Sequence, residues 1–282
     1  MAKCRKKPNY YHVGSLEKGI AILRILAAGG AMSLEAVAAQ AGMDRSGCHR
    51  YLLTLRDLGL LVKDGTAGYR LTTGIFEIAM QYTNRLEVRQ TAWPYMEEIA
   101  RKYNETVNLV VLNGDHVVFL YKIESSHQYR AEIAVGTRHP VYCTAQGKSI
   151  IAFRPQNERD AYCRAMCDLK AFSARTITAP EVFKQEIAAV RRRGFAINNE
   201  EYFAGISGVA APVFDYTGFA VYALSVAGPS VRMPMDTLLC IGQDLKEVCA
   251  RLSAKLGADP FMPLHCLPQW KNSSPNRKET EK

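Results

Sequence analysis

The first candidates for chemistry are four polar residues at the start of one predicted helix, namely Arg45, Ser46, His49 and Arg50. Arginine side chains can read the edge of guanine, and hydroxyl groups can bond to bases or phosphates. In a helix-turn-helix, the leading residues of the second helix enter the major groove of DNA. We predict that the first three of these residues contact base edges and that Arg50 contacts the DNA backbone.

The elements that must present these side chains are predicted just before them. Ser33 is a good N-cap for a first helix, because its hydroxyl can accept a hydrogen bond from a free N–H of the next turn. Gly42 lies where a helix usually ends in a left-handed residue, and Asp44 can cap the second helix. The apolar face of that second helix is predicted to consist of Cys48, Leu52 and Leu55.

A short basic hairpin over residues 61–71 follows, with glycines near its tip. Beside such a helix, a basic hairpin is typical of a wing that contacts phosphates. The residues predicted to position the DNA backbone are Ser33, Arg50, Lys63, Tyr69 and Arg70. The plainer alternative is a pair of helices that packs against another part of the protein and leaves Arg45 and Arg50 solvated.

The positive charge is concentrated near the N-terminus. The chain has 282 residues, 48% of them hydrophobic and 22% charged, which indicates ordinary globular domains and leaves room for two of them. Residues 1–73 carry eleven lysines and arginines against five acidic residues, so they hold six of the nine excess positive charges. Nucleic acid is the expected partner, because the amphipathic face and aromatic anchors of a membrane-surface helix are missing here.

The eight cysteines form no Cys-x-x-Cys motif, and no signal peptide or run of transmembrane length is evident. The sequence therefore predicts a cytoplasmic protein with free thiols and no membrane partner. Cys163 and Cys167 lie one turn apart on a predicted helix and could join His127 or His139 in a metal site, or act as a redox pair. The same spacing is that of ordinary core residues, so no metal site is predicted.

Two helical regions flank the DNA-binding elements. Ser15 is predicted to cap a helix that runs to about Ala28. Its buried stripe is predicted to consist of Leu16, Ile20, Leu23 and Ala27. A second helical region extends from residue 74 to about 103, and residues 74–90 are interpreted as a linker helix between two domains or as a dimerisation helix. Residues 1–13 form a basic arm, for which a frayed terminus is the plainer interpretation.

The second half of the chain alternates between strand and helix patterns. Strands are predicted over 107–112, 117–123, 129–135, 195–198, 209–214 and 219–226. Helices are predicted over 145–153, 157–166, 182–193 and 235–256, with Thr144 capping the first and Pro180 beginning the third. This pattern predicts an α+β domain with about six mostly antiparallel strands, which can hold a small molecule between its sheet and loops. Residues 258–282, with four prolines and many charges, are predicted to be disordered.

Four ordered motifs cover nearly all of residues 14–256. They are Ser15–Leu23; Arg45–Leu55 with Tyr69–Leu71; Val135–Pro140 with Ala145–Ser149; and Arg193–Tyr202 with Gly205–Val213 and Ala223–Pro229. Together they resemble the IclR family of bacterial transcriptional regulators. The resemblance implies a winged helix-turn-helix over 14–73, a linker helix over 74–90 and a GAF-like effector-binding domain with an antiparallel sheet over 91–257. It also implies homodimers or homotetramers on palindromic operators in double-stranded DNA.

The resemblance further implies an effector site. The positions that match the family's effector contacts are Ala145, Gln146, Asn198, Gly208, Ser225 and Ala227. Several members carry Asp, Cys and Ser where this chain has Asn198, Gly208 and Ala227, so the chemistry of the cleft differs. Room at the two small residues, and free N–H groups at the start of the helix at 145, predict an organic acid or another polar catabolite larger than a two-carbon acid. The plainer interpretation of Gly208 is a strand position that needs close backbone approach.

The sequence contains no convincing catalytic site. Gly147-Lys148-Ser149 lacks the first glycine of a P-loop, because Tyr142 occupies that position. Glu200 and Glu201 are adjacent on a predicted strand, so they would point to opposite faces. We therefore predict a ligand-responsive, sequence-specific DNA-binding regulator, a repressor or an activator, that controls a catabolic operon in response to a small organic acid or polar metabolite, with no catalytic residue, metal or cofactor. The alternatives are a metabolite-binding enzyme and an adaptor that uses the winged helix to bind protein.

Overall fold

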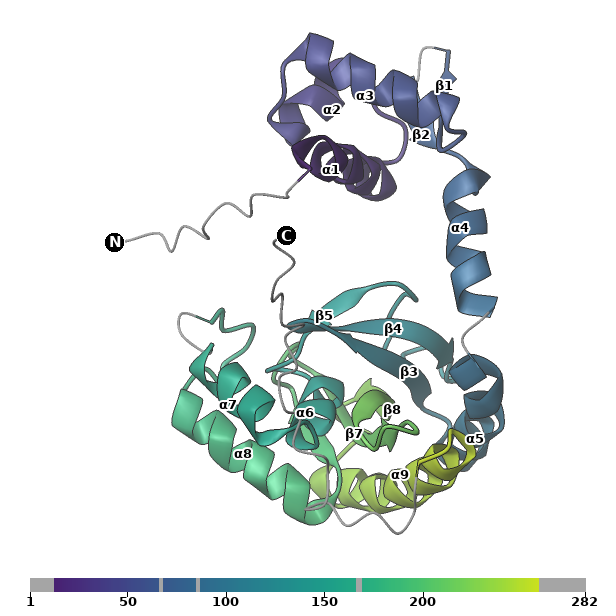
Figure 1. Ribbon diagram of the computed structural model, residues 1–282. Helices are drawn as coiled ribbons and strands as arrows, with labels where there is room; N and C mark the ends of the chain where they lie inside the picture. Colours follow the sequence, from purple (N-terminus) through teal and green to yellow (C-terminus); the bar gives the residue numbers. More distant parts are fainter. Residues whose placement is uncertain (1–12, 66–67, 85–86, 166–168, 259–282) are drawn as a thin grey trace, which may run out of the picture. The chain divides into compact units, whose positions relative to one another are not determined.

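The computed structural model describes residues 13–65, 68–84, 87–165 and 169–258, and we refer to these as the described residues. They divide into two compact units, with the boundary between Leu86 and Glu87 (Figure 1). The basic arm up to residue 12, Cys167 and the tail from residue 259 lie outside the described residues, so the predictions made for them stay predictions.

The first unit has the order of elements expected for a winged helix. Its elements are α1 (Gly14–Gly29), α2 (Leu34–Ala41), α3 (Arg45–Asp57), β1 (Leu61–Asp64), β2 (Gly68–Leu71) and α4 (Thr73–Asn84). The two strands pair antiparallel, with Leu61 opposite Leu71. The core of the unit collects apolar residues from the three helices and both strands, including Ile22, Leu26, Val37, Leu52 and Leu61.

The prediction for α1 was wrong in its cap and in its buried face. The helix starts at Gly14, and its N-cap Val13 makes no side-chain capping bond, so Ser15 is not the cap. Ile22 and Leu26 are buried, whereas Leu16 and Ile20 of the predicted stripe are exposed. The helix is apolar almost all round, and helical spacing alone therefore did not decide which face is covered by α2 and α3.

The helical region predicted from 74 to 103 is two helices. The first, α4, ends at Asn84, and α5 spans Glu87–Tyr103 in the second unit. Residues 85–86 lie outside the described residues. The interpretation of 74–90 as one linker helix is thus replaced by two helices that belong to different compact units.

The second unit is built on a six-stranded antiparallel sheet with the strand order β5-β4-β3-β8-β7-β6. The strands are β3 (Thr106–Asn113), β4 (His116–Ile123), β5 (Arg138–Pro140), β6 (Ala196–Asn199), β7 (Ile206–Phe214) and β8 (Ala220–Pro229). The remaining helices are α6 (Ala145–Ala152), α7 (Gln156–Arg164), α8 (Pro180–Arg193) and α9 (Met235–Lys255). The prediction of an α+β fold with an antiparallel sheet is confirmed.

Helices cover both faces of this sheet. On one face, α5 packs against β3 and α9 packs against β7. On the opposite face, α6 packs over β7 and β8 (Figure 1). Helix α8 contacts α6 and continues that layer outwards. The buried cluster on the α6 side includes Val110, Phe119, Ile150, Phe183 and Ala210.

The strand predicted over 129–135 is absent, and a three-residue strand, β5, lies at 138–140 instead. The backbone before β5 makes scattered bonds rather than a ladder: Gly136 N donates to Phe119 O, and Phe119 N donates to Thr137 O. Farther back, the carbonyl of Ala131 accepts from the Thr106 hydroxyl. A side chain thus takes a bond that a neighbouring strand would otherwise provide.

Candidate DNA-binding face and effector cavity

The helix-turn-helix is fixed by three local signals that the sequence carries. The Ser33 hydroxyl accepts from Ala36 N at 3.2 Å, and the Asp44 carboxylate accepts from Gly47 N at 2.8 Å. Between them, Gly42 has φ +62°, which a residue with a side chain adopts rarely. The predicted caps and turn are confirmed.

The orientation of α3 also follows the prediction. Cys48, Leu52 and Leu55 are its buried residues. The residues left exposed at the leading end include Arg45, Ser46, His49 and Arg50. Gly47 lies within this turn, and its N–H donates to the Asp44 carboxylate. The polar face is therefore available to a ligand as large as DNA.

Arg45 is held by an ion pair across the two helices. Its guanidinium lies 2.9 Å from the carboxylate of Glu35 on α2, and both side chains are more than half exposed. Exposed pairs of this kind contribute little free energy, about 0–1 kcal/mol. Arg45 can consequently exchange Glu35 for a base at small cost.

The wing brings two of its predicted phosphate contacts to the surface but buries the third. Lys63 and Arg70 are exposed, and Arg70 pairs with Asp64 at 3.1 Å. Tyr69, by contrast, is 3% exposed and belongs to the core of the unit, where its backbone pairs with Met32. The prediction that Tyr69 contacts the DNA backbone is corrected accordingly: its ring supports the wing, with Lys63 lying 5.9 Å from the ring centre.

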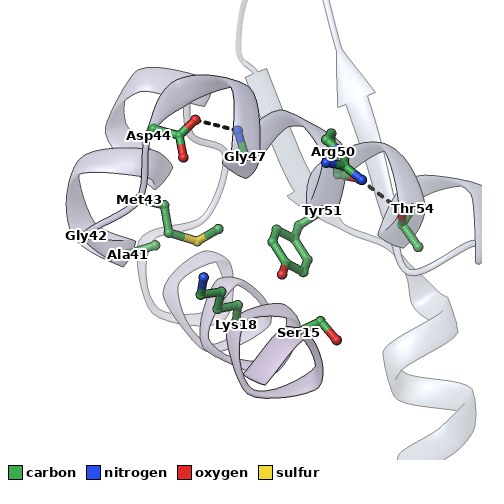
Figure 2. A pocket seen from close by; sticks show the side chains of 10 residues that line it. All are labelled: Ser15, Lys18, Ala41, Gly42, Met43, Asp44, Gly47, Arg50, Tyr51 and Thr54. Atoms are coloured by element: carbon green, nitrogen blue, oxygen red, sulfur yellow. Dashed lines mark hydrogen bonds between the residues drawn. The ribbon is translucent and has the colours of Figure 1, made fainter. Parts of the chain in front are cut away.

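A hollow of about 520 Å³ lies beside α3 in the same unit (Figure 2). Ser15 and Lys18 reach it from α1, and Arg50, Tyr51 and Thr54 reach it from α3. The α2–α3 turn closes the third side. Its lining is polar and carries two basic residues and one acidic residue, so it widens the charged surface next to the leading edge of α3.

The predicted effector residues are brought together in the second unit. Ala145, Gln146, Asn198, Gly208 and Ala227 all line one small cavity of about 30 Å³. The sixth predicted residue, Ser225, is buried behind the lining, and its hydroxyl accepts from the amide of Gln146 at 2.8 Å. Strand register explains the grouping, because Asn198 lies opposite Gly208, and Gly208 lies opposite Ala227.

The expectation that small residues leave room here is wrong for this structure. A Cβ on Gly208 would lie 2.8 Å from the carbonyl oxygen of Val226, so glycine serves close backbone approach, as the plainer interpretation held. The cavity volume of about 30 Å³ is similar to the volume that one molecule occupies in liquid water. Small side chains at Gly208 and Ala227 therefore do not indicate an effector larger than a two-carbon acid.

Aromatic rings fill the space instead, and the sequence analysis missed them. His139 lies 4.5 Å from Tyr202 and 4.8 Å from Phe119, and Tyr202 lies 4.3 Å from Phe203, as measured between ring centres. Burial lowers the pKa of His139 to about 4, helped by the charge of His116, so the ring is neutral near pH 7. These residues come from separate strands and loops, and no local pattern could have grouped them.

A buried ion pair holds α6 beside this cavity. The ammonium of Lys148 lies 2.5 Å from the carboxylate of Glu201, and both side chains are almost fully buried. Burial raises the pKa of Glu201, while Lys148 acts to lower it. Glu201 follows the end of β6 and is not on a strand, which corrects the prediction for Glu200 and Glu201. The interpretation of Lys148 as structural fits this contact.

The cysteines give no sign of metal or redox chemistry in the part of the chain that is described. Burial raises the pKa of Cys163, and it raises that of Cys143 to about 12, which disfavours the reactive thiolate. No group of three or more potential metal ligands occurs among the described residues. In the same part of the chain, no helix is both long enough and apolar enough to cross a membrane.

Comparison with known proteins assigns both units. The family model described as "Bacterial transcriptional regulator IclR C-terminal" matches residues 80–254, and the model "IclR helix-turn-helix domain" matches residues 15–65. The chain is 30% identical over 258 residues to the glycerol operon regulatory protein of Streptomyces coelicolor. The alignment covers 89% of this chain and 99% of that protein.

Solved structures of IclR proteins have the same fold. The Thermotoga maritima IclR structure is 30% identical, with a TM-score of 0.70 over 87% of this chain and all of that one. An IclR homolog from Microbacterium hydrocarbonoxydans, solved in complex with 4-hydroxybenzoate, has a TM-score of 0.75 at 22% identity over 86% of this chain and 98% of that one. The chain belongs to the IclR family of bacterial transcriptional regulators, which bind DNA through a helix-turn-helix and are not enzymes.

Proposed function

We propose that this regulator represses a catabolic operon. Binding of a small organic acid to the second unit lowers or raises its affinity for DNA. The observation that carries the proposal is the capped α2–turn–α3 unit, whose buried face leaves a polar, basic leading edge exposed. The similarity to the glycerol operon regulatory protein of Streptomyces coelicolor supports control of catabolism. The setting is the cytoplasm, where operator DNA is found.

The exposed residues of the first unit that are predicted to contact DNA have separate proposed roles. Arg45, Ser46 and His49 meet base edges from the leading turns of α3. Ser33, Arg50, Lys63 and Arg70 bond to phosphates and fix the register on the duplex. Lys18, at the rim of the hollow beside Arg50, is a candidate for a further phosphate contact.

The effector is proposed to bind at the cavity that Ala145, Gln146, Asn198, Gly208 and Ala227 line. Thr144 caps α6 by accepting from Gly147 N at 3.2 Å, and the N–H groups of Ala145 and Gln146 in the same turn precede the helical ladder. Free N–H groups at a helix start favour an anion. The complex of the Microbacterium homolog with 4-hydroxybenzoate supports an organic acid as the ligand class.

The DNA-binding unit is proposed to act as a pair. Leu16 and Ile20 on α1 are exposed, as are Phe76 and Ile78 on α4. Leu16 and Ile20 lie one turn apart on α1, and contiguous exposed apolar side chains commonly mark an association surface. This supports a homodimer or a homotetramer on a palindromic operator, whose two half-sites mirror the symmetry of the protein.

The test is binding to the DNA upstream of the protein's own coding sequence, measured at fixed salt with and without a panel of organic acids. Specific binding that one acid changes supports the proposal in full. Binding should also weaken steeply with salt, because neutralised phosphates release counterions. Binding that is only non-specific and equal on scrambled DNA would overturn the regulatory role.

A further inference from the structure

A fully buried amide on the central strand β3 of the second unit has no hydrogen-bond partner among the described residues. Asn108, on β3, is 0% exposed, and both its Oδ1 and its Nδ2 are unpartnered among the described residues. Buried polar groups are nearly always hydrogen-bonded, so a residue that leaves both a donor and an acceptor unused calls for a reason. The neighbouring residues on the sheet supply one.

Strand register places this amide next to two predicted effector residues. Asn108 lies directly opposite Ser225 on β8, so the two side chains share one face of the sheet. That face is the one covered by α6, because the Ser225 hydroxyl accepts from the Gln146 amide. Gln146 in turn lines the cavity. A line of polar groups therefore leads from the cavity through Gln146 and Ser225 towards Asn108.

The polar side chains along this line are uncharged. Asn108, Ser225 and Gln146 can each donate and accept, and none carries a formal charge. Lys122, opposite Asn108 on β4, is ion-paired with Glu124 at 2.6 Å. A carboxylate placed here would leave Asn108 Oδ1 without a donor, and an ammonium would leave Nδ2 without an acceptor. A hydroxyl group satisfies both atoms.

We propose that Asn108 is the floor of the effector site and binds a hydroxyl group of the effector, which makes the ligand a hydroxy acid. This inference rests on the proposed function of the second unit. On binding, the ligand hydroxyl takes the place of the Gln146 amide beside Ser225, and Gln146 turns towards the cavity. Phe203 is half exposed and lines the cavity.

The experiment compares acids that differ by one hydroxyl: glycolate with acetate, lactate with propionate, 3-hydroxybutyrate with butyrate, and mandelate with phenylacetate. Binding to the full-length protein is measured by calorimetry and by thermal shift. We expect at least one hydroxy acid to bind at least tenfold more tightly than its partner. In Asn108→Leu that preference should fall below threefold, while the Tm without ligand stays the same or rises, because the unpartnered amide is gone.

Two further variants keep the test decisive. Ser225→Ala, a small truncation, should also weaken the hydroxyl preference, and it serves if Asn108→Leu does not fold. Asn113→Leu, at the exposed end of the same strand, should leave the preference unchanged. A wild-type protein without any hydroxyl preference, or an Asn108→Leu protein that keeps it, overturns the inference; the second result would mean that Asn108 bonds only to internal water.

Binding of the ligand-free variants to the upstream DNA separates this inference from the proposed function. If Asn108→Leu binds that DNA as wild type does and no hydroxyl preference exists, only the hydroxyl assignment fails. If wild type shows no specific DNA binding, the proposed function itself fails.

Discussion

Arg45 is the residue for which we propose the most direct contact with a base. Its guanidinium is at the first turn of α3 and pairs with the exposed carboxylate of Glu35. We expect Arg45→Ala to weaken operator binding by about 1–3 kcal/mol if Arg45 makes a bidentate contact to guanine. Fluorescence anisotropy against the operator and against single-base variants measures this, and the loss should concentrate at one base position.

Glu35→Gln is the matched control for that experiment. It removes the ion pair and one negative charge near the DNA face without removing the arginine. The affinity for operator should stay the same or rise slightly, because an exposed pair is worth no more than about 1 kcal/mol. If Glu35→Gln weakens binding as much as Arg45→Ala does, the ion pair and not the base contact is what matters.

His139 makes the stability of the second unit depend on pH. Its pKa in the folded protein is about 4, below the ordinary value of 6.5. The unfolded chain therefore binds the proton more readily, and stability present above pH 6.5 is lost as the pH falls towards 4. We expect a loss of about 1–2 kcal/mol from this group, because solvent screens a ring that is not fully buried.

Urea unfolding between pH 7 and pH 4.5 measures this loss. His139→Phe keeps a ring among Phe119 and Tyr202 but cannot be protonated, so its stability should fall less over that range. His127→Gln, at an exposed position, should follow wild type. Parallel curves for wild type and His139→Phe would contradict the assignment.

At the scale of helices and strands, caps and turns could be predicted from the sequence, but which face of a helix is buried could not. Ser33, Gly42 and Asp44 act within four residues of themselves, so their roles were readable along the chain. The buried face of α1 depends on which apolar side its neighbours cover, and residues at spacings of three and four fit two stripes. The strand at 138–140 was missed because three residues carry too little alternation to be recognised.

The candidate sites divide in the same way. Five of the six predicted effector residues line one cavity, because the resemblance carried their positions across distant strands. Tyr69 was misplaced because a tyrosine in a basic hairpin suits either the core or a phosphate contact. The aromatic filling of the cavity, and the unpartnered amide of Asn108, arise only when β3, β8 and α6 meet.

The Lys148–Glu201 pair predicts how firmly α6 is held. Removing one partner of a buried ion pair leaves an uncompensated charge, which costs about 3–5 kcal/mol. We expect Lys148→Met to destabilise the protein by that amount in urea unfolding. Adding Glu201→Leu should restore much of the loss, because the stranded carboxylate is then gone.

Arg101→Met provides the surface comparison, since its pair with Glu97 is exposed. It should cost less than about 1 kcal/mol. A Lys148→Met protein within 1 kcal/mol of wild type would mean that Glu201 is protonated or rehydrated in the variant, and that the pair does not anchor α6.

At the scale of the whole molecule, the two units have separate cores, and each carries a different part of the function. The first unit has a small core and leaves several large apolar side chains in solvent. In a protein that reads two half-sites, an association surface in this unit would set their spacing. The positive charge of residues 1–73 adds affinity for any DNA but no sequence preference.

The exposed apolar side chains of α1 give the last prediction. Leu16 is 65% exposed and Ile20 is 42% exposed, so Leu16→Glu with Ile20→Glu should leave the fold intact. Burying one such side chain at an interface is worth about 1.5–3 kcal/mol. If α1 pairs the DNA-binding units, the double variant should bind the operator at least about tenfold more weakly, since 1.4 kcal/mol corresponds to a factor of ten. Val231→Glu, an equally drastic change at an 86% exposed site in the second unit, should bind like wild type. Sedimentation of both variants shows whether the chain still associates through other surfaces. If the double variant binds the operator with the affinity of wild type, α1 is not the surface that pairs the two DNA-binding units.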